Sequence, residues 1–421
     1  MNSVLTPVWK TAEKKWKNKL HNICSYLAMF PPSLPNYFID QFTVEGDYVL
    51  DPFCGRGTAL LEASLLKRIP IGNDLNPLAY TLSFSKVNIP KYEKIKKRIK
   101  QLQSKYKPED ISEEPDDIKM LFDEELTLPQ LCYFKKNLIK NKPIDMFILS
   151  MLLGILHGQH RKDGSSNSLS ISMPNTFSMS PNYIREYIKK NNLIKLKQDV
   201  FECLYKRLED IYPFDSEFTK GYVFQDNALN LSNKKYKKFY HKIKLIVTSP
   251  PYLKVINYGK YNWIRLWLLD EKSEDVDSEL RINSAYRKVD KIKLSDDMKL
   301  EQYLEFMKQL ICGWEKLITE DGVVAIVIGD VDNHKGVDLN LAQAVWNFVR
   351  PYTNFKKLAI IKDSIDGNSK VTKIWGRERK GNATKTDRIL LLSKDINALK
   401  KANHTKKVKN YYANLYGGKN V

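Results

Sequence analysis

Short apolar runs rich in β-branched residues recur in the first and last parts of the chain, and each of them ends at a turn. Runs of this length, bounded by turn residues, indicate buried strands. The strands predicted in this way span residues 48–51, 69–73, 221–225, 243–247, 323–328, 357–362 and 388–392. Helical patterns separate several of them, at about 300–319 and at 340–350. This alternation predicts an α/β fold built on a largely parallel sheet.

The strand signals vanish between Leu75 and about Lys220, and residues 127–158 have an apolar, helical pattern. We therefore predict one sheet domain in two parts, residues 1–86 and 221–393, with a mainly helical insertion at 87–220. Residues 271–298 are charged and are predicted to form a loop, and residues 394–421 form a basic tail.

Composition favours a polyanionic partner. The formal net charge is +20, which is unusual for an enzyme of small acidic metabolites and indicates nucleic acid first and a membrane surface second. The longest apolar run, at 147–156, is too short to cross a bilayer. Since the N-terminus has no signal-peptide pattern, we expect a cytoplasmic protein.

A metal site is not expected. The five cysteines are scattered without C-x-x-C spacing, which argues against both a disulfide framework and a cysteine zinc site. His157 and His160 have a possible ligand spacing, but no carboxylate or thiolate partner is evident in the sequence.

Three basic segments are candidates for contacts with nucleic acid. Residues 91–107 carry eight basic residues and one acid, residues 160–172 mix basic and hydroxyl side chains, and residues 373–380 lie between the last two strands. Each segment has two readings, a solvated surface or a set of phosphate contacts. The residues predicted to contact nucleic acid are Lys96, Lys97, Arg161, Lys162, Arg377 and Arg379.

The strand at 48–51 runs into a glycine turn and then into a helix. Gly55 and Gly57 allow a ligand to approach the backbone closely, and the next strand ends in Asp74, about 20 residues on, where a doubly wound fold places a carboxylate on a ribose. No Gly-Lys-Ser/Thr follows, and the third glycine of the dinucleotide fingerprint is missing. The turn therefore predicts a nucleoside ligand without a pyrophosphate. Asp226, after the third strand, can accept a hydrogen bond from an adenine amine, although Asp-Asn is also a common turn.

The strand at 243–247 ends in Thr248-Ser249-Pro250-Pro251-Tyr252. Two prolines fix φ and remove two backbone donors, which makes a stiff turn that presents a hydroxyl, carbonyl acceptors and a tyrosine ring. Such a turn suits a flat, amine-bearing ring. The alternative is a proline-rich loop that only closes the strand.

Together these motifs resemble the class I S-adenosylmethionine-dependent DNA amino-methyltransferases, and most closely the SPPY group, the cytosine-N4 enzymes of restriction–modification systems. The resemblance implies a Rossmann-like, seven-stranded sheet, with Asp74 on the cofactor ribose and Asp226 at its adenine amine. Phe30, within Met29–Pro32, resembles the N-terminal cofactor-side motif of the family. The implied cofactor-loop residues are Asp51, Phe53, Gly55, Gly57 and Thr58, and the implied catalytic residues are Ser249, Pro250, Pro251 and Tyr252.

An exocyclic amine is a poor nucleophile because its lone pair is conjugated with the ring. Acceptors at Ser249 and at the Pro250 carbonyl can take its two hydrogens, while Tyr252 stacks on a base flipped from the duplex. Carbon-5 methylation needs a cysteine after proline, and the chain contains no Pro-Cys. The resemblance further implies duplex DNA as substrate, a restriction endonuclease as genetic partner and a monomeric enzyme.

Three alternatives stay open at this point: adenine-N6 methylation of DNA by the same turn, guanine-N2 methylation of RNA, and a DNA-binding module without activity. Many family members carry the catalytic motif ahead of the cofactor motif, whereas here the cofactor motif comes first. This order puts in doubt any copying of their target-recognition region, and the helical insertion at 87–220 is the candidate for DNA target recognition in this chain. The recognised sequence is not encoded in any spacing seen here.

Overall fold

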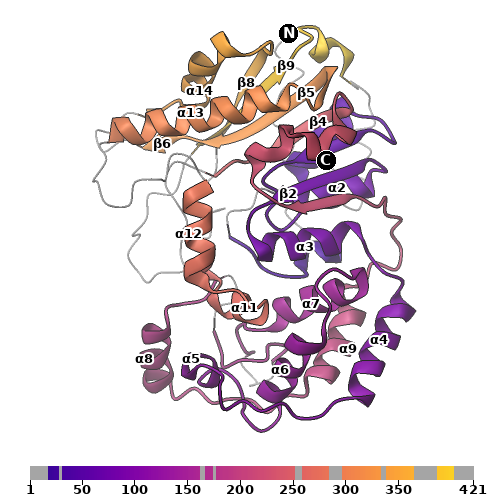
Figure 1. The fold of residues 1–421 in the computed structure, drawn as a ribbon, viewed down its shortest axis with the longest axis vertical. Helices are drawn as coiled ribbons and strands as arrows, with labels where there is room; N and C mark the ends of the chain where they lie inside the picture. The colour runs from indigo at the N-terminus through magenta and orange to yellow at the C-terminus, as the bar shows by residue number, and fades with distance from the viewer. Residues whose placement is uncertain are drawn as a thin grey trace, which may run out of the picture.

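The computed structural model describes residues 18–27, 31–161, 166–173, 177–251, 258–283, 296–332, 338–364 and 386–402. Seven strands in these ranges form one sheet in the order β3-β2-β1-β4-β5-β9-β8 (Figure 1). They are β1 (Tyr48–Asp51), β2 (Ile69–Asp74), β3 (Tyr222–Gln225), β4 (Ile243–Thr248), β5 (Ile318–Gly329), β8 (Lys356–Ser364) and β9 (Thr386–Ser393). The short β6 (Val331–Asp332) and β7 (Asp338–Leu339) pair separately.

Strands β3, β2, β1, β4 and β5 are parallel, and β9 runs antiparallel between β5 and β8. This is the strand order of the class I methyltransferase sheet, which confirms the seven-stranded, Rossmann-like fold expected from the sequence. The order reverses between β1 and β4, so the carboxyl ends of these two strands lie at the point where such sheets bind their ligands.

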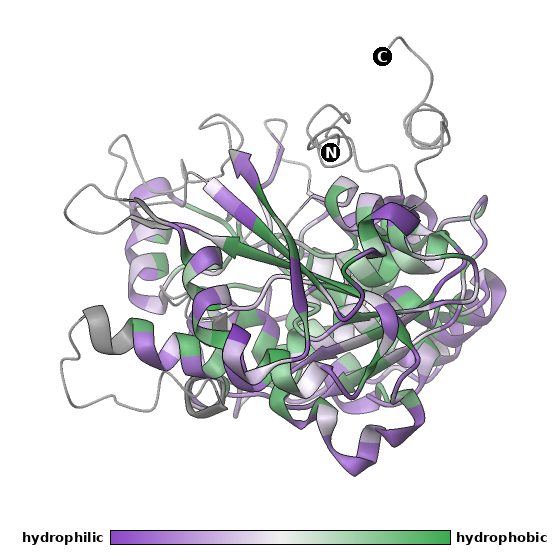
Figure 2. Ribbon diagram, turned by 90° about the horizontal axis from the view of Figure 1, so that it is seen from above, coloured by the Kyte–Doolittle hydropathy of each residue, from purple (hydrophilic) through white to green (hydrophobic). Residues whose placement is uncertain are grey.

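Both faces of the sheet are covered, and alternate strand residues supply the two cores. Val49 and Leu245 pack with α1 (Ser33–Phe42) and α2 (Thr58–Leu65) on one face. Leu50 and Ile246 pack on the other face. That face is covered by η3 (Ala228–Ser232), η4 (Lys234–Phe239), α13 (Asp296–Trp314) and α14 (Leu341–Val349). Figure 2 shows the hydrophobic strands at the centre, with the hydrophilic residues toward the outside. Two short 3₁₀ helices, η6 (Arg350–Tyr352) and η7 (Ala398–Lys401), follow α14 and β9.

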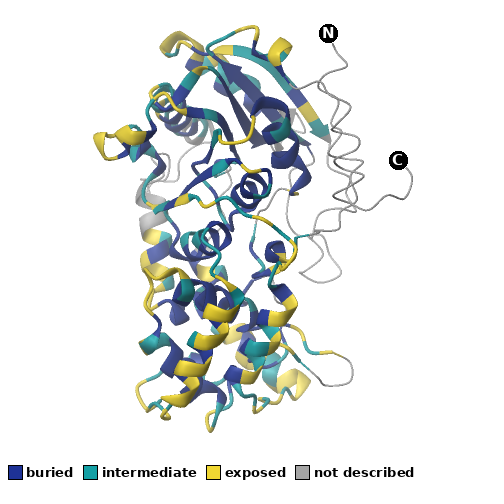
Figure 3. Cartoon of the chain, turned by 90° about the vertical axis from the view of Figure 1, so that its right-hand side faces the viewer, coloured by how far each residue is buried: buried dark blue, intermediate teal, exposed yellow. Residues whose placement is uncertain are grey.

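Helix α3 (Pro77–Val87) leads from the sheet into a helical body, residues 92–211 (Figure 1). Its helices are α4 (Tyr92–Ser104), α5 (Asp116–Lys119), α6 (Thr127–Asn137), α7 (Pro143–Ile155), α8 (Pro181–Asn191) and α9 (Val200–Ile211). Helix α7 is buried almost throughout, while the exposed residues gather on the outer turns of the body (Figure 3).

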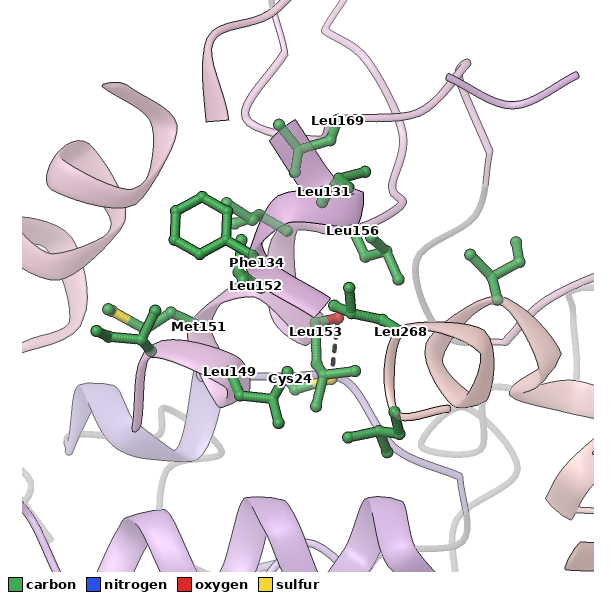
Figure 4. Close-up of a cluster of buried hydrophobic side chains, with 14 of the residues drawn as sticks. Cys24, Leu131, Phe134, Leu149, Met151, Leu152, Leu153, Leu156, Leu169 and Leu268 are labelled. Atoms are coloured by element: carbon green, nitrogen blue, oxygen red, sulfur yellow. Dashed lines mark hydrogen bonds between the residues drawn. The ribbon is translucent and has the colours of Figure 1, made fainter. Parts of the chain in front are cut away.

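The core of the helical body draws on residues from outside it. Cys24, from the N-terminal segment (residues 18–27, with η2 at Lys19–Asn22), donates from Sγ to the Leu153 carbonyl at 3.5 Å. Leu268, from α11 (Trp263–Leu268), packs in the same cluster (Figure 4). A boundary drawn along the sequence at residues 87 and 220 therefore separates residues that share one core.

Two element predictions were wrong. Residues 271–298 were expected to be a loop, but they contain helix α12 (Ser273–Asn283), which buries Val276 and whose Asp277 accepts from the backbone N–H groups of Gly259 and Lys260 in α10 (Tyr258–Tyr261). Val276 and Leu280 stand four residues apart, but two apolar positions among charged residues are too few to define a helical period over 271–298. The helix predicted to reach 319 ends at Trp314, and β5 already begins at Ile318.

Across the residues that the structure describes, no helix combines the length and the apolar character needed to cross a membrane.

Candidate active site

The loop between β1 and α2 has a shape that glycine permits. Gly55 and Gly57 have φ values of +49° and +78°, and Gly57 donates to the Cys54 carbonyl at 2.7 Å. A Cβ atom on Gly57 would lie 2.9 Å from Ser83 Oγ and 3.0 Å from Ser83 Cα. Helix α2 begins directly after this glycine, so its first N–H groups open onto the loop.

We predict that Gly57→Ala destabilises the protein by roughly 2–4 kcal/mol, because the left-handed conformation and the contact with Ser83 both oppose a side chain. Denaturant unfolding of the variant measures this loss. Gly46→Ala, also at positive φ but with nothing within 4 Å of its Cβ position, is the control and should lose only the strain of its backbone conformation. Equal losses in the two variants would contradict the close packing at Gly57.

Asp74 joins the cofactor loop to the turn that follows β2. Its Oδ2 accepts from Gly55 N at 2.8 Å, and its Oδ1 accepts from Asn76 N at 3.0 Å. Desolvation raises the pKa of Asp74 to about 6, against the effect of these backbone hydrogen bonds. The carboxylate thus lies where two backbone turns converge.

Asp51 links the same loop to the turn after β4. Thr248 Oγ1 donates to Asp51 Oδ1 at 2.6 Å, and Phe53 N donates to the same oxygen at 3.2 Å. Asp51 and Thr248 are both buried, and desolvation raises the pKa of Asp51 to about 7. The two motifs, 197 positions apart, are therefore held together by one buried hydrogen bond.

The contribution of Asp51 and Asp74 to the stability of the apo protein should fall as the pH rises from about 4 to about 8. Both carboxyls have folded-state pKa values above the ordinary 3.8, so the folded state binds more protons in this range, and their contribution is lost as the pH passes about 6 and about 7. Unfolding free energies at pH 5 and pH 8 test this for the wild type and for Asp51→Asn. The variant should show the smaller loss, and equal losses would contradict the role of Asp51.

Ser249 and Pro251 are half-buried and Pro250 is buried, directly after the last residue of β4. The structure thus places the first three residues of the predicted catalytic turn beside the cofactor loop. Five predicted site residues lie outside the described residues: Phe30, Lys162, Tyr252, Arg377 and Arg379.

The carboxylate of Asp226 is occupied within its own turn. Asn227 N and Asn230 Nδ2 donate to Oδ1, each at 2.8 Å. Lys235 Nζ and Tyr236 Oη donate to Oδ2, at 2.9 and 2.5 Å. Burial alone would raise the pKa of Asp226, but these hydrogen bonds lower it to about 2. A further donor would have to displace one of them, and the exposed Lys235 is the partner most easily exchanged.

The basic candidates separate in space. Lys96 and Lys97 are exposed on α4, which Arg98 fastens to Asp145 in the first turn of α7. The opposite end of α7 meets Cys24 beside the cofactor loop. Arg161 is exposed in the segment that follows this end, and a later part of that segment, at Ser178, donates to the Tyr261 carbonyl in α10. The structure therefore separates Arg161, which follows the Cys24 end of α7, from Lys96 and Lys97, which lie on the helix fastened to the other end of α7.

Sequence reasoning missed the buried polar residues behind the cofactor loop. Lys86 Nζ donates to the Arg56 carbonyl at 2.7 Å, and Arg56 Nη1 donates to the Cys24 carbonyl at 3.4 Å. Asn76 Nδ2 donates to Tyr26 Oη at 3.3 Å. The sequence held one signal for these buried polar residues, namely a charged residue inside an apolar helix. Glu62 in α2 and Lys86 in α3 are examples.

Nothing in the described part of the chain gathers three or more side chains able to hold a metal ion. The site is instead made of backbone turns, the buried carboxyl of Asp51, the half-buried carboxyl of Asp74 and a proline-rich turn. The left-handed turn at Gly55 and Gly57, which runs into the first N–H groups of α2 with Asp74 beside it, fits a nucleoside-containing cofactor.

The chain is similar to known DNA methyltransferases. The DNA methylase family model N6_N4_Mtase matches residues 2–85. The Type II methyltransferase M.MjaII of Methanocaldococcus jannaschii is 24% identical over 76% of this chain and 74% of its own length. The Type II methyltransferase M.BsoBI of Geobacillus stearothermophilus is 24% identical over 72% of this chain and 63% of its own length. A solved rRNA methyltransferase, aviRa from Streptomyces viridochromogenes, aligns over 91% of this chain and 95% of its own at 9% identity, with a TM-score of 0.33, too low to indicate a shared fold.

The strand order, the paired turns at β1 and β4 and these sequence similarities lead to one assignment. The family-model match and the Type II relatives support an S-adenosylmethionine-dependent DNA methyltransferase of the restriction–modification type, and the matching model covers both N6 and N4 enzymes by name.

Proposed function

We propose that this protein transfers the methyl group of S-adenosylmethionine to the N4 amine of a cytosine flipped out of duplex DNA, as the modification partner of a restriction endonuclease. The observation that carries the proposal is the buried hydrogen bond between Thr248 and Asp51. It holds the Ser249–Pro251 turn against the loop whose glycines permit a cofactor to approach.

The cofactor residues follow from this arrangement. Bound S-adenosylmethionine supplies an electrophilic methyl group on a sulfonium. The loop backbone at Gly55 and Gly57 and the start of α2 at Thr58 form the floor, with Asp51 and Phe53 shaping its entry. Asp74 accepts from the ribose hydroxyls, and Asp226 is assigned to the adenine amine once Lys235 gives up its place on Oδ2. Phe30 is assigned to the cofactor site on the basis of its sequence motif alone.

The catalytic turn acts by positioning. Ser249 Oγ and the Pro250 carbonyl accept the two hydrogens of the target amine, which leaves the nitrogen lone pair directed at the methyl group. Pro251 keeps the turn stiff, and Tyr252 stacks on the flipped ring. The proton is lost to solvent after transfer, and no covalent intermediate with the protein is needed.

Cytosine is favoured over adenine because serine precedes Pro-Pro-Tyr in this chain, which resembles the cytosine-N4 group. Adenine-N6 methylation by the same turn is the second candidate, since the matching family model covers both reactions by name. The net charge of +20 supports a polyanionic substrate.

The helical body is the proposed site of target recognition, together with the segment that carries Arg161. Helix α4 of this body, which carries Lys96 and Lys97, would reach only DNA that extends beyond the target base. Lys162, Arg377 and Arg379 remain proposed phosphate contacts from the sequence. A monomer acting in the cytoplasm fits modification of hemimethylated duplex.

The test of substrate class is a competition between nucleic acids. The purified protein is incubated with labelled S-adenosylmethionine, mixed-sequence duplex DNA and total RNA, followed by selective nuclease digestion. Label that disappears with deoxyribonuclease supports the proposal. Label that disappears only with ribonuclease contradicts it and favours an RNA methyltransferase, and absence of any label favours a module without activity.

A further inference from the structure

A single buried carboxylate holds two separate parts of the N-terminal region. Glu62 Oε1 accepts from His21 Nε2 at 2.6 Å, and Glu62 Oε2 accepts from Asn36 Nδ2 at 2.7 Å. All three residues are at most 5% exposed. Burial lowers the pKa of His21, more than the neighbouring Glu62 raises it, so the ring is neutral near pH 7 and donates through Nε2.

The segment held by His21 lies directly against the cofactor loop. A Cβ atom on Gly55 would lie 3.4 Å from Tyr26 Cε1, and Tyr26 Oη accepts from Asn76 Nδ2 at 3.3 Å. Gly55 and Asn76 are the two residues whose backbone N–H groups bond Asp74. Tyr26 thus bridges the same two turns that Asp74 joins.

Glu62 also lies on α2, the helix that begins at the cofactor loop. Helix α2 therefore follows the loop directly at Thr58 and carries Glu62 one turn later. Glu62 in turn holds the segment that packs on the loop. Asn36, on α1, ties the chain that returns from this segment to the same carboxylate. The anchor orders the segment before any ligand arrives.

We propose that Glu62 is a positioning residue for methyl transfer, which sets the cofactor site by fixing residues 18–27 against the loop at Gly55 and the turn at Asn76. This inference rests on the proposed function, because it assigns the cofactor to that loop. Glu62 touches neither the cofactor nor the target base. It acts through His21 and Tyr26.

The test compares Glu62→Gln with a matched variant in the full-length protein. A glutamine at 62 can accept only one of the two hydrogen bonds, since its amide nitrogen is a donor. Asp145→Asn is the control: Asp145 is a buried carboxylate in the helical body that likewise accepts from a side chain, Arg98, and also from Ile139 N. Titration calorimetry with S-adenosylmethionine gives Kd, and thermal unfolding gives stability.

We expect both variants to lose stability, and only Glu62→Gln to raise Kd for S-adenosylmethionine, by about tenfold, with KM for DNA unchanged. His21→Leu should weaken cofactor binding as well, whereas His21→Gln, which keeps a donor, should restore part of it. This pair carries the test if Glu62→Gln fails to fold.

A Kd in Glu62→Gln or His21→Leu equal to that of the wild type overturns the inference and leaves the proposed function intact. Equal increases in Glu62→Gln and Asp145→Asn also overturn it, because general destabilisation would explain both. Wild-type protein that binds no S-adenosylmethionine overturns the proposed function and the inference together.

Discussion

Replacing Asp74 by alanine should raise the Kd for S-adenosylmethionine at least about 100-fold. The variant removes the assigned partner of the ribose hydroxyls and at the same time releases Gly55 N and Asn76 N, which the carboxylate holds at 2.8 and 3.0 Å. Loss of this half-buried acceptor costs more than its own hydrogen bonds, because both backbone donors lose their partner where β2 ends. Titration calorimetry on the apo protein measures the effect directly.

Asp47→Ala is a suitable control for this variant. Asp47 also accepts from a backbone N–H, that of Val44 at 2.8 Å, but it lies just before β1, at the opposite end of the strand from the loop. Its Kd for the cofactor should equal that of the wild type. A similar loss in both variants, or unchanged binding in Asp74→Ala, would contradict the assignment of the site.

Replacing Ser249 by alanine should lower kcat by about 10²–10³-fold, the usual cost of removing one preorganised hydrogen-bonding group from a transition state. The Kd for S-adenosylmethionine should stay the same, because the change lies on the turn after β4 and leaves the loop after β1 intact. Single-turnover methylation at saturating cofactor and DNA isolates this step from binding and product release.

Thr248→Ser provides the matched control one residue earlier. It keeps the hydroxyl that donates to Asp51 at 2.6 Å, so the two turns should stay joined and kcat should change little. If Ser249→Ala retained full kcat, the amine would not depend on this hydroxyl, and the turn would act through its carbonyls and Tyr252 alone.

Local patterns were sufficient to predict the sheet. The strands ending at Asp51, Asp74 and Thr248 are short apolar runs bounded by turn residues, so each could be detected without knowledge of its neighbours. The same holds for the two site turns, because glycine and proline restrict or relax the backbone locally. Their meeting at the carboxyl edge follows from the general geometry of parallel sheets.

The supporting shell of the site could not be predicted in the same way. His21 and Glu62 are 41 positions apart, and Arg265 Nη2 donates to Ser25 Oγ across 240 positions. No sequence period connects such pairs, because each residue satisfies a partner brought to it only by the folded chain. Asp226 shows the converse limit: its place after β3 was correct, but the four donors that occupy its carboxylate come from the turn that follows.

The identity of the methylated nucleoside tests the central claim most directly. Duplex DNA of mixed sequence is incubated with the protein and S-adenosylmethionine, digested to nucleosides and analysed by mass spectrometry. The account predicts N4-methyldeoxycytidine, absent when Ser249→Ala replaces the wild type under matched conditions. N6-methyldeoxyadenosine would contradict the base assignment while keeping the mechanism, and DNA without any methylated nucleoside would contradict the account as a whole.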